Sequence, residues 1–545
     1  MTMEFLHVPP APLSDDATQH MVRMRDGVRL ATDVYLAGDQ PGPTILIRLP
    51  YDKVGSYTFI PLIAAYFVRH GYHVVAQDVR GKFRSEGEAL LFVNEAVDGY
   101  DAIEWITHQA FSDGIVGMWG DSYYGYTQWA AVSTQHPALR AISPRVTGTR
   151  LGELPSNEDG GATRDVEMAV ALLYPCTFFH SNDVYLWEPD WDRRPLVDNI
   201  EEFFETVGSR SISFDQWYPH QVRLRRFPAG HPVDARPVPV LMTIGWWDNC
   251  APWQWSDHWK LVEHQGWRES EYLLIESIDH ENNNLLNPRG EVPTPEELEE
   301  MLPEYLDPSI EFFDVFLRDR APSTSIPKVR WNLAHTEGFQ VSDQWPPADV
   351  VTRTWYLDAD RLSESIAAAG ELTWVHDPTD LVPSPVKNAF AFLGEQPDER
   401  DWAARKDVLV FDADPVTDPT DLVGGVVLNA TVASTGPSMD VFARVLDVAP
   451  DGAAHLVARG QVHVKDATVR TDAAIDLGQI GYRLAAGHRL RLHIASSDYP
   501  EFIPQSGTGE NFWSATEFAS NTQTLVVGGD VGAHLVIGAV RTLSP

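Results

Sequence analysis

Short apolar runs alternate with amphipathic stretches over two parts of the chain. The apolar runs predict buried strands, and the amphipathic stretches carry apolar side chains at the spacing of a helix. The predicted strands are residues 44–49, 73–78, 115–119, 238–244 and 272–275, and the predicted helices are residues 61–69, 95–107, 253–264 and 296–318. Such an alternation favours a parallel sheet covered by helices. The pattern therefore predicts an α/β domain.

Two other regions lack this alternation. Between the two α/β parts, Trp, Arg, Pro and Asp cluster without the two-residue period of a strand, which predicts a mostly helical insertion. Towards the C-terminus, short apolar runs alternate with Gly, Pro and Asp turns, which is typical of a β-sandwich or jelly roll. We predict an α/β domain in residues 1–148 and 237–328, a helical cap in residues 149–236, and an all-β jelly-roll domain in residues 329–545.

The composition indicates a large globular protein, and its charge argues against two classes of binding partner. The chain has 545 residues, of which 43% are hydrophobic, and 18 Trp, so it has ample apolar surface to bury. The 78 acidic and 41 basic residues give a formal net charge of -37, which repels nucleic acids and anionic membranes. We expect neither as a partner. The sequence allows a homo-oligomer and does not set the number of subunits.

The first residues and the cysteines exclude further classes. The N-terminal residues show no basic segment followed by an apolar run, and no run of about 18 apolar residues occurs, so we expect a cytoplasmic protein without a membrane span. Cys176 and Cys250 are too few for a disulfide framework, and no Cys/His cluster has the spacing of a structural zinc site. We expect both cysteines to pack in the interior and expect no bound metal.

A serine follows the predicted strand at residues 115–119, within the segment GDSYYG at residues 120–125. A nucleophile elbow needs a tight turn from strand to helix and a small residue two places before the serine, which Gly120 supplies. The signature Gly-x-Ser-x-Gly is not met, because Tyr124 stands where its second glycine belongs. Ser122 is a candidate nucleophile, and the alternative is that it caps the following helix.

An acid and a base follow Ser122 in a suitable order. Enzymes built on such an elbow have the chain order Ser, then Asp or Glu, then His, with the last two on loops after later strands. Asp248 lies just past the predicted strand at residues 238–244, and His280 follows the predicted strand at residues 272–275. We therefore predict Ser122, Asp248 and His280 as the catalytic residues.

Other titratable residues are weaker candidates. Asp279 adjoins His280, but neighbouring side chains seldom reach the geometry of an acid–base pair, and Asp121 is expected to point away from the chemistry. His258 and His264 fall within a predicted helix, where packing or solvated roles are commoner. The histidines that lie away from strand ends are His20, His180, His220, His231 and His335.

With these residues the chain resembles the cocaine esterase and X-Pro dipeptidyl-peptidase (CocE/NonD) type of α/β-hydrolase. The resemblance covers most of the chain apart from the insertion, and its C-terminal motifs would not occur in a generic hydrolase. The matching motifs are RLPY at residues 48–51, QDVRG at 77–81, SEG at 85–87, GDSYYG at 120–125, GWWD at 245–248, His280, AGHRLRL at 486–492 and SS at 496–497.

The resemblance implies an α/β-hydrolase domain, a helical cap and a C-terminal jelly roll. It implies a triad of Ser122, Asp248 and His280, with an oxyanion hole made by the hydroxyl of Tyr51 and the backbone N–H of Tyr123. Tyr51 follows the predicted strand at residues 44–49, whose loop carries a second oxyanion donor in α/β-hydrolases. One departure concerns a jelly-roll contact, because Pro504 and Gln505 stand where many relatives have Arg and Asn.

Several aromatic residues adjoin the predicted catalytic groups. They are Trp119, Tyr123, Trp246 and Trp247. Trp119 and Trp246 are expected to pack in the core, whereas Trp247 is expected to line the substrate pocket.

The predicted function is hydrolysis of small-molecule carboxylic esters, with amides as a weaker class, and no cofactor. The alternatives are an X-Pro dipeptidyl-peptidase, an α-amino acid ester hydrolase or β-lactam acylase, and an acyltransferase. The least favoured hypothesis is a non-catalytic protein that binds a partner through its jelly roll. Loss of catalysis in the hydrolase domain should have removed one of the triad candidates, and all three are present. Carboxylates of the cap are candidates to hold a substrate ammonium group, and solvation at the surface is the alternative for each of them; they include Glu153, Glu158, Asp159, Asp183, Glu188, Asp190 and Asp192.

Overall fold

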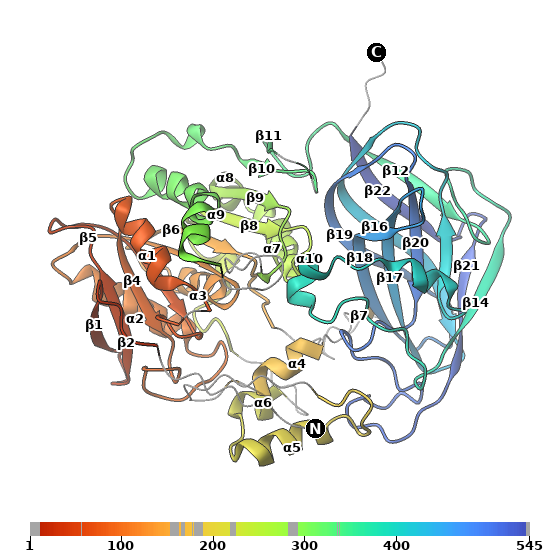
Figure 1. The fold of residues 1–545 in the computed structure, drawn as a ribbon, viewed down its shortest axis with the longest axis horizontal. Coiled ribbons are helices and arrows are strands. Elements are labelled where there is room, and N and C mark those ends of the chain that lie inside the picture. The colour runs from red at the N-terminus through yellow and green to blue at the C-terminus, as the bar shows by residue number, and fades with distance from the viewer. Residues whose placement is uncertain are drawn as a thin grey trace.

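The computed structural model describes residues 11–55, 57–152, 163–164, 169–176, 178, 189–217, 225–281, 293–334, 336 and 338–540. Figure 1 shows an α/β part and an all-β part side by side, with short helices at the base between them. Within the described ranges, no helix combines the length and the apolar character needed to cross a bilayer.

A ten-stranded sheet forms the α/β part, in the strand order β1-β2-β4-β3-β5-β6-β8-β9-β10-β11. From β4 to β10 neighbouring strands are parallel, whereas β1, β2 and β11 add antiparallel edges. The strands are β1 (Thr18–Arg23), β2 (Arg29–Tyr35), β3 (Gly42–Leu49), β4 (His73–Asp78), β5 (Ser112–Asp121), β6 (Leu139–Arg145), β8 (Val240–Gly245), β9 (Glu271–Glu276), β10 (Val329–Trp331) and β11 (Gln340–Ser342). The loops after β3, β5, β8 and β9 therefore meet at the carboxyl edge of the sheet, where open α/β sheets bind ligands.

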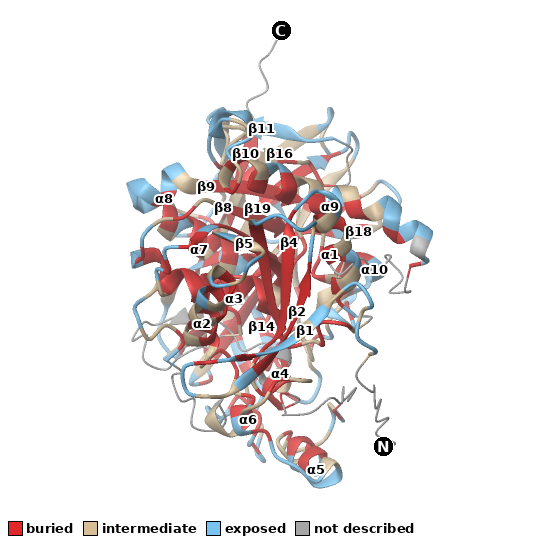
Figure 2. Cartoon of the chain, turned by 90° about the vertical axis from the view of Figure 1, so that its left-hand side faces the viewer, coloured by how far each residue is buried: buried red, intermediate tan, exposed pale blue. Residues whose placement is uncertain are grey.

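Helices cover both faces of this sheet. One apolar cluster contains α1 (Ile60–Arg69) and α9 (Pro295–Phe316), and another contains α2 (Glu95–Thr107), α3 (Ser122–Ser133), α7 (Ala251–Glu263) and α8 (Gln265–Ser270). Figure 2 shows the central strands as a buried layer between these helices. Every residue of β4, β8 and β9 is buried. Burial on both faces explains why these strands are continuous apolar runs and do not alternate.

The start of α9 illustrates how local sequence sets an element. The hydroxyl of Thr294 accepts a hydrogen bond from the backbone N–H of Glu297, whose carboxylate accepts one from the N–H of Thr294. This capping box satisfies two donors that a helix start leaves open, and Pro295 suits the first helical position.

The described part of the insertion contains helices, one short strand and connecting loops. It contains α4 (Ala169–Cys176), α5 (Asp198–Val207), α6 (Ile212–Trp217) and the 3-10 turn η1 (Pro232–Asp234). Its apolar cluster includes Ile503, Phe512 and Trp513 of the C-terminal part, and its short strand β7 (Thr163–Arg164) pairs with β18 there. The insertion therefore packs against both parts of the molecule.

The C-terminal part consists of two antiparallel sheets that pack face to face around one core. The larger sheet contains β12 (Val350–Leu357), β13 (Leu362–Ser363), β14 (Gly370–His376), β16 (Thr420–Ser434), β19 (Thr471–Leu484), β21 (Asn521–Val527) and β22 (His534–Val540). The smaller contains β15 (Leu409–Asp412), β17 (Ser438–Val448), β18 (Ala454–Lys465) and β20 (Arg489–Ala495) together with β7. The short helical turn η3 (Ser323–Ser325) precedes these strands, and three further turns lie between β14 and β15: η4 (Ala389–Ala391), α10 (Phe392–Glu395) and η5 (Glu399–Ala404). Much of β16 alternates between buried and half-buried residues, as expected when one face meets the core.

The predicted fold class, an α/β-hydrolase sheet followed by an all-β domain, is confirmed. The pattern missed β1, β2 and β6. Only Val22 of β1 is buried, so this edge strand carries little apolar signal. Strands β10 and β11 lie beyond residue 328, where the predicted jelly-roll domain begins, and they continue the first sheet through β9. The predicted domain boundaries stay a prediction.

Candidate active site

The turn between β5 and α3 presents Ser122. Its φ of 48° lies in the left-handed region, which a serine adopts only where the surrounding structure imposes it. A Cβ at Gly120 would lie 2.0 Å from Cδ2 of Tyr124, so only glycine fits two places before the serine. A Cβ at Gly125 would lie 2.6 Å from Cγ2 of Thr147. The late second glycine therefore allows α3 to pack closely against the segment after β6.

A buried charge cluster supports this turn. Asp121 accepts hydrogen bonds from the hydroxyls of Tyr124, at 3.2 Å, and Tyr305, and its Oδ1 lies 3.1 Å from Nε of Arg145. Arg145 also lies 3.7 Å from the carboxylate of Glu276. Burial raises the pKa of Asp121 to about 6, against the opposing charge of Arg145. As predicted, Asp121 points away from the reactive groups.

Ser122, His280 and Asp248 form a continuous chain of hydrogen bonds. Nδ1 of His280 lies 2.8 Å from Oδ1 of Asp248, and Nε2 lies 3.0 Å from Oγ of Ser122. Because a carboxylate only accepts, Nδ1 carries the proton, and in the neutral ring Nε2 then accepts from the serine hydroxyl. Asp248 follows β8 and His280 follows β9, so the carboxyl edge of the sheet brings the three predicted residues together.

The competing residues have other partners. The carboxylate of Asp279 accepts the backbone N–H of Leu393 at 2.7 Å. Nδ1 of His258 pairs with Glu271 at 2.9 Å, and His264 ends α7. His20 packs on Trp105, and His231 caps η1. His180, His220 and His335 lie outside the described residues.

Ser122 and His280 open into an aromatic cavity of about 210 Å³. Sequence reasoning missed most of its wall, which comes from segments far apart in the chain. The missed lining residues are Tyr57, Phe92, Tyr124, Leu151, Gly152, Tyr174, Asn249, Cys250, Trp253, Glu281 and Phe390. Of the described lining residues, Glu281 alone carries a carboxylate.

Tyr51 lines this cavity beside the serine. Its ring meets Tyr57 and Tyr124 edge-on, with centroids 5.8 Å and 6.3 Å apart, and its hydroxyl lies 3.3 Å from that of Tyr174. The hydroxyl also interacts with Ser122. Burial raises the pKa of Tyr51, so the phenol keeps its proton at neutral pH and is able to donate.

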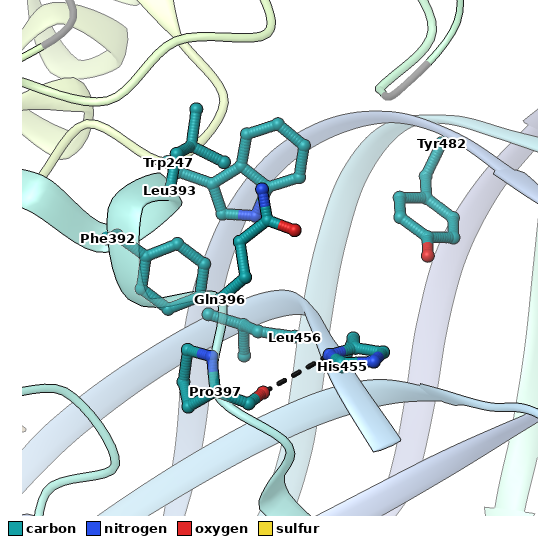
Figure 3. A pocket seen from close by; sticks show the side chains of 8 residues that line it. All are labelled: Trp247, Phe392, Leu393, Gln396, Pro397, His455, Leu456 and Tyr482. Atoms are coloured by element: carbon teal, nitrogen blue, oxygen red, sulfur yellow. Dashed lines mark hydrogen bonds between the residues drawn. The ribbon is translucent and has the colours of Figure 1, made fainter. Parts of the chain in front are cut away.

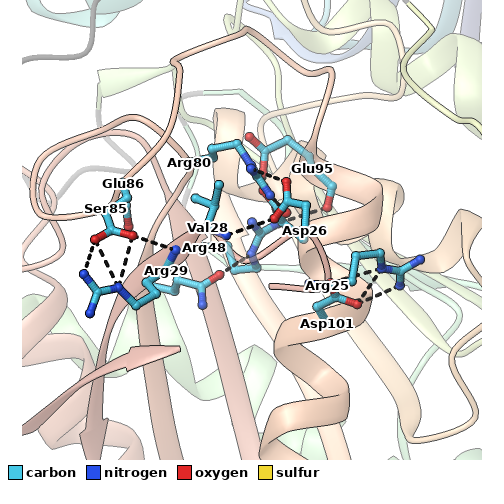
Figure 4. A network of polar contacts seen from close by, with 12 residues as sticks. Arg25, Asp26, Val28, Arg29, Arg48, Arg80, Ser85, Glu86, Glu95 and Asp101 are labelled. Carbon is cyan, nitrogen blue, oxygen red and sulfur yellow. Dashed lines mark hydrogen bonds and ion pairs between the residues drawn. The ribbon is translucent and has the colours of Figure 1, made fainter. Parts of the chain in front are cut away.

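Tyr123 follows Ser122 directly and is the residue whose backbone N–H was predicted as the second oxyanion donor. It lies in the first turn of α3, where backbone N–H groups have no acceptor within the helix. Its buried hydroxyl donates to Oε1 of Glu95 at 3.0 Å, and Oε2 of Glu95 is 3.0 Å from Nη1 of Arg48. Figure 4 shows Arg48 and Glu95 among further ion pairs of this region, such as Arg80 with Asp26. This buried network anchors the start of α3.

The structure does not bring Trp247 to the cavity around Ser122. Trp247 instead packs against the C-terminal core and lines a second pocket with Phe392, Gln396 and Tyr482, as Figure 3 shows. Trp253, in the first turn of α7, lines the cavity instead, and a substrate contact of Trp247 stays a prediction. Trp119 is fully buried in the core, as expected.

The C-terminal part completes the site. The ring of Phe390, from η4, lies 5.0 Å from the ring of His280 and lines the cavity. The neighbouring turn of α10 is tied to the histidine loop by the hydrogen bond between Leu393 and Asp279. Trp246 packs between the two parts and donates its indole N–H to the backbone of Asn332 at 3.1 Å.

Two other features noted in the sequence are Gln505 and the cap carboxylates. Gln505 donates to both carboxylate oxygens of Asp440, at 3.1 and 3.2 Å, and accepts from Ser438, so it makes polar contacts within the jelly roll. Of the cap carboxylates, Asp190 and Asp192 are exposed. The others lie outside the described residues: Glu153, Glu158, Asp159, Asp183 and Glu188.

Burial and charge set the protonation of the reactive groups. Burial disfavours the imidazolium of His280, but the neighbouring Cys250 and the carboxylate of Asp248 outweigh it, so the pKa of His280 lies above its ordinary value. Burial and the charge of Asp248 raise the pKa of Cys250 to about 11. The thiol is therefore protonated at neutral pH, and the charge of Asp248 is the one that acts on His280 there.

The fold and this arrangement define the class: the protein is a serine hydrolase on an α/β-hydrolase scaffold. A model of the X-Pro dipeptidyl-peptidase (S15 family) matches residues 26–282, and one of the X-Pro dipeptidyl-peptidase C-terminal non-catalytic domain matches residues 323–535. Together they cover most of the chain. The chain belongs to the CocE/NonD and X-Pro dipeptidyl-peptidase S15 family.

Individual relatives agree with this membership. Cocaine esterase from Rhodococcus sp. (strain MB1 Bresler) is 29% identical over 546 residues, which covers 90% of this chain and 92% of the relative. The crystal structure of an aminopeptidase from a marine sediment archaeon, Thaumarchaeota archaeon, matches with a TM-score of 0.80 at 21% identity, over 97% of this chain and 98% of that one. An α-amino acid ester hydrolase matches with a TM-score of 0.79 at 21% identity and the same coverage. These two structures show the shared fold.

Proposed function

We propose that the protein hydrolyses small-molecule carboxylic esters through an acyl-enzyme on Ser122. The observation that carries the proposal is the hydrogen-bonded chain from Ser122 through His280 to Asp248, which opens into an aromatic cavity. A serine on a strained turn with a paired base supports nucleophilic attack on an acyl carbon. The small cavity suits a small substrate with an apolar acyl group.

The reaction proceeds in two halves. Ser122 attacks the carbonyl carbon while Nε2 of His280 takes its proton, and Asp248 holds the ring and stabilises the imidazolium. The hydroxyl of Tyr51 and the N–H of Tyr123 donate to the oxyanion. His280 then gives its proton to the leaving alcohol. Water, deprotonated in turn by His280, releases the acid from the acyl-enzyme.

Replacing Tyr51 by phenylalanine tests the oxyanion role. The ring packing is kept and only the hydroxyl is lost, so we expect kcat to fall on the order of 10² to 10³ with KM little changed. Steady-state kinetics on one ester measures both constants. Tyr174→Phe is the matched control, since its hydroxyl touches that of Tyr51 and the proposal gives it no direct bond to substrate. A Tyr51→Phe enzyme within about threefold of the wild-type kcat would leave backbone amides as the whole oxyanion hole.

The rate should fall as pH drops through the pKa of His280, because the imidazolium cannot accept the serine proton. This pKa lies above its ordinary value, so the acidic limb of kcat/KM should have its midpoint above about pH 6.5. Asp248→Asn removes the negative charge that stabilises the imidazolium, so the limb of the residual activity should move to lower pH. A limb that stays in place in this variant contradicts the assignment of Asp248.

A panel of esters, amides and peptides tests the substrate class. We expect cleavage of small esters, weaker cleavage of amides, and no cleavage of folded proteins, because the insertion and Phe390 enclose the serine. Preference for X-Pro peptides over every ester would overturn the ester proposal. Adding an alcohol or amine and measuring the product ratio separates hydrolysis from acyl transfer.

Glu281 favours a second candidate within this class, an ester that carries an ammonium group. Its carboxylate lies beside Tyr57 and is the one carboxylate among the lining residues that the structure describes. Matched esters with and without an amine should then differ in KM, and Glu281→Gln should remove the difference. Equal KM values for both esters in the wild type would dismiss this candidate.

A further inference from the structure

Three side chains of the kinds that bind transition metals meet at His280. Cys250, His280 and Asp248 each bring one ligand atom, and the three atoms lie within 4.8 Å of one another. All three residues are buried. Thiolate sulfur, imidazole nitrogen and carboxylate oxygen are the usual ligands of Zn²⁺.

One carboxylate oxygen of Asp248 accepts no hydrogen bond within the described residues. Oδ1 accepts from Nδ1 of His280 at 2.8 Å and from the backbone N–H of Cys250 at 3.0 Å. Oδ2 is buried and accepts no hydrogen bond from any residue that the structure describes, and the side chain is 0% exposed to solvent. A buried carboxylate oxygen without a donor is unfavourable, and a cation would satisfy it.

We propose that Cys250, His280 and Asp248 form a binding site for a soft divalent cation such as Zn²⁺, and that its occupation inhibits the enzyme. Tetrahedral Zn²⁺ holds ligand atoms about 3.3 to 3.8 Å apart, so side-chain shifts of about 1 Å complete the site. Cys250 and His280 line the cavity, which gives the ion a route, and the net charge of -37 draws cations to the protein.

Binding is an exchange of ligands without electron transfer. Zn²⁺ loses water molecules, the Cys250 thiol releases its proton to solvent as the zinc–sulfur bond forms, and Nδ1 of His280, on the side of Asp248, coordinates the ion while its proton moves to Nε2. Nε2 then carries a proton and is unable to take that of Ser122, and Asp248 no longer orients the ring. The inhibition rests on the proposed function, whereas the binding does not.

Co²⁺ tests the binding without any need for activity. Metal-free wild type, Ser122→Ala, Cys250→Ser and Cys176→Ser are each titrated with Co²⁺, and the thiolate-to-metal absorption in the near ultraviolet is recorded. We expect the band in wild type, Ser122→Ala and Cys176→Ser, and its loss in Cys250→Ser. Cys176 is the matched control, because it is buried in the cluster of the insertion. Absence of the band from wild type overturns the proposal.

The second experiment tests whether Zn²⁺ inhibits ester hydrolysis by the enzyme. Zn²⁺ should inhibit wild type and a chelator should restore the rate, whereas Mg²⁺ and Ca²⁺ should have no effect because they prefer sites built of oxygen. In Cys250→Ser, measured against its own metal-free rate, the inhibition constant should rise roughly 100-fold or more. An unchanged inhibition constant in this variant overturns the proposal.

Discussion

Ser122→Ala is expected to abolish turnover and covalent labelling together. Intact mass after treatment with a fluorophosphonate should show one adduct on the wild type and none on the variant. We expect kcat to fall on the order of 10⁶, because the nucleophile and its base act as one unit. The residual rate should reflect the oxyanion donors and substrate binding alone.

Folding is the control for this variant. Ser122 occupies a left-handed backbone position that alanine also strains, so circular dichroism and the thermal midpoint should be compared with those of the wild type. Ser133→Ala, in the last turn of α3, is a matched serine away from the cavity and should keep its adduct. An adduct that survives Ser122→Ala would move the nucleophile elsewhere.

Asp248→Ala and His280→Ala are expected to be folded and nearly inactive, while Asp279→Ala keeps most of the activity. Loss of the acid should lower kcat on the order of 10⁴, because the imidazole then loses its orientation and its stabilising charge. Asp279 precedes the histidine in the chain, but its carboxylate accepts the N–H of Leu393. The measurement is kcat/KM for the three variants on one ester.

Asp279 is a demanding control, because its hydrogen bond ties the histidine loop to α10. Asp279→Asn keeps an acceptor oxygen for Leu393 and should rescue any loss that Asp279→Ala shows. The acid assignment fails if Asp248→Ala keeps more than about a tenth of the activity while Asp279→Ala loses it.

The local apolar pattern was sufficient to predict the limits of some elements and the residues that lie just after a strand. The limits of β4 and α2 agree with the apolar pattern, since helix and strand periods are local properties. Ser122, Asp248 and His280 could be predicted together for a related reason. Parallel strands bring their carboxyl ends to one edge, so residues just after β5, β8 and β9 meet whatever the loops between them do.

The direction of a side chain in an irregular turn could not be predicted from the sequence. Trp247 and Asp248 are neighbours in the chain, yet Asp248 faces His280 and Trp247 faces the C-terminal core. Sequence adjacency does not determine on which side of an irregular turn a side chain lies. Cys250 was predicted to be buried, and it is, but its contact with His280 arises because the loops after β8 and β9 lie side by side.

The sequence by itself therefore determined the fold class, the elbow and the candidates at strand ends, because each depends on period, turn chemistry and chain order. The tertiary structure alone decided the walls of the cavity, since Tyr57, Tyr174, Trp253 and Phe390 come from four separate segments. It also decided that β10 and β11 extend the first sheet. The physical reason is the same in each case. These contacts join segments that are far apart in the chain, so a local sequence pattern does not predict them. They form only once the sheet, the insertion and the C-terminal core have packed together.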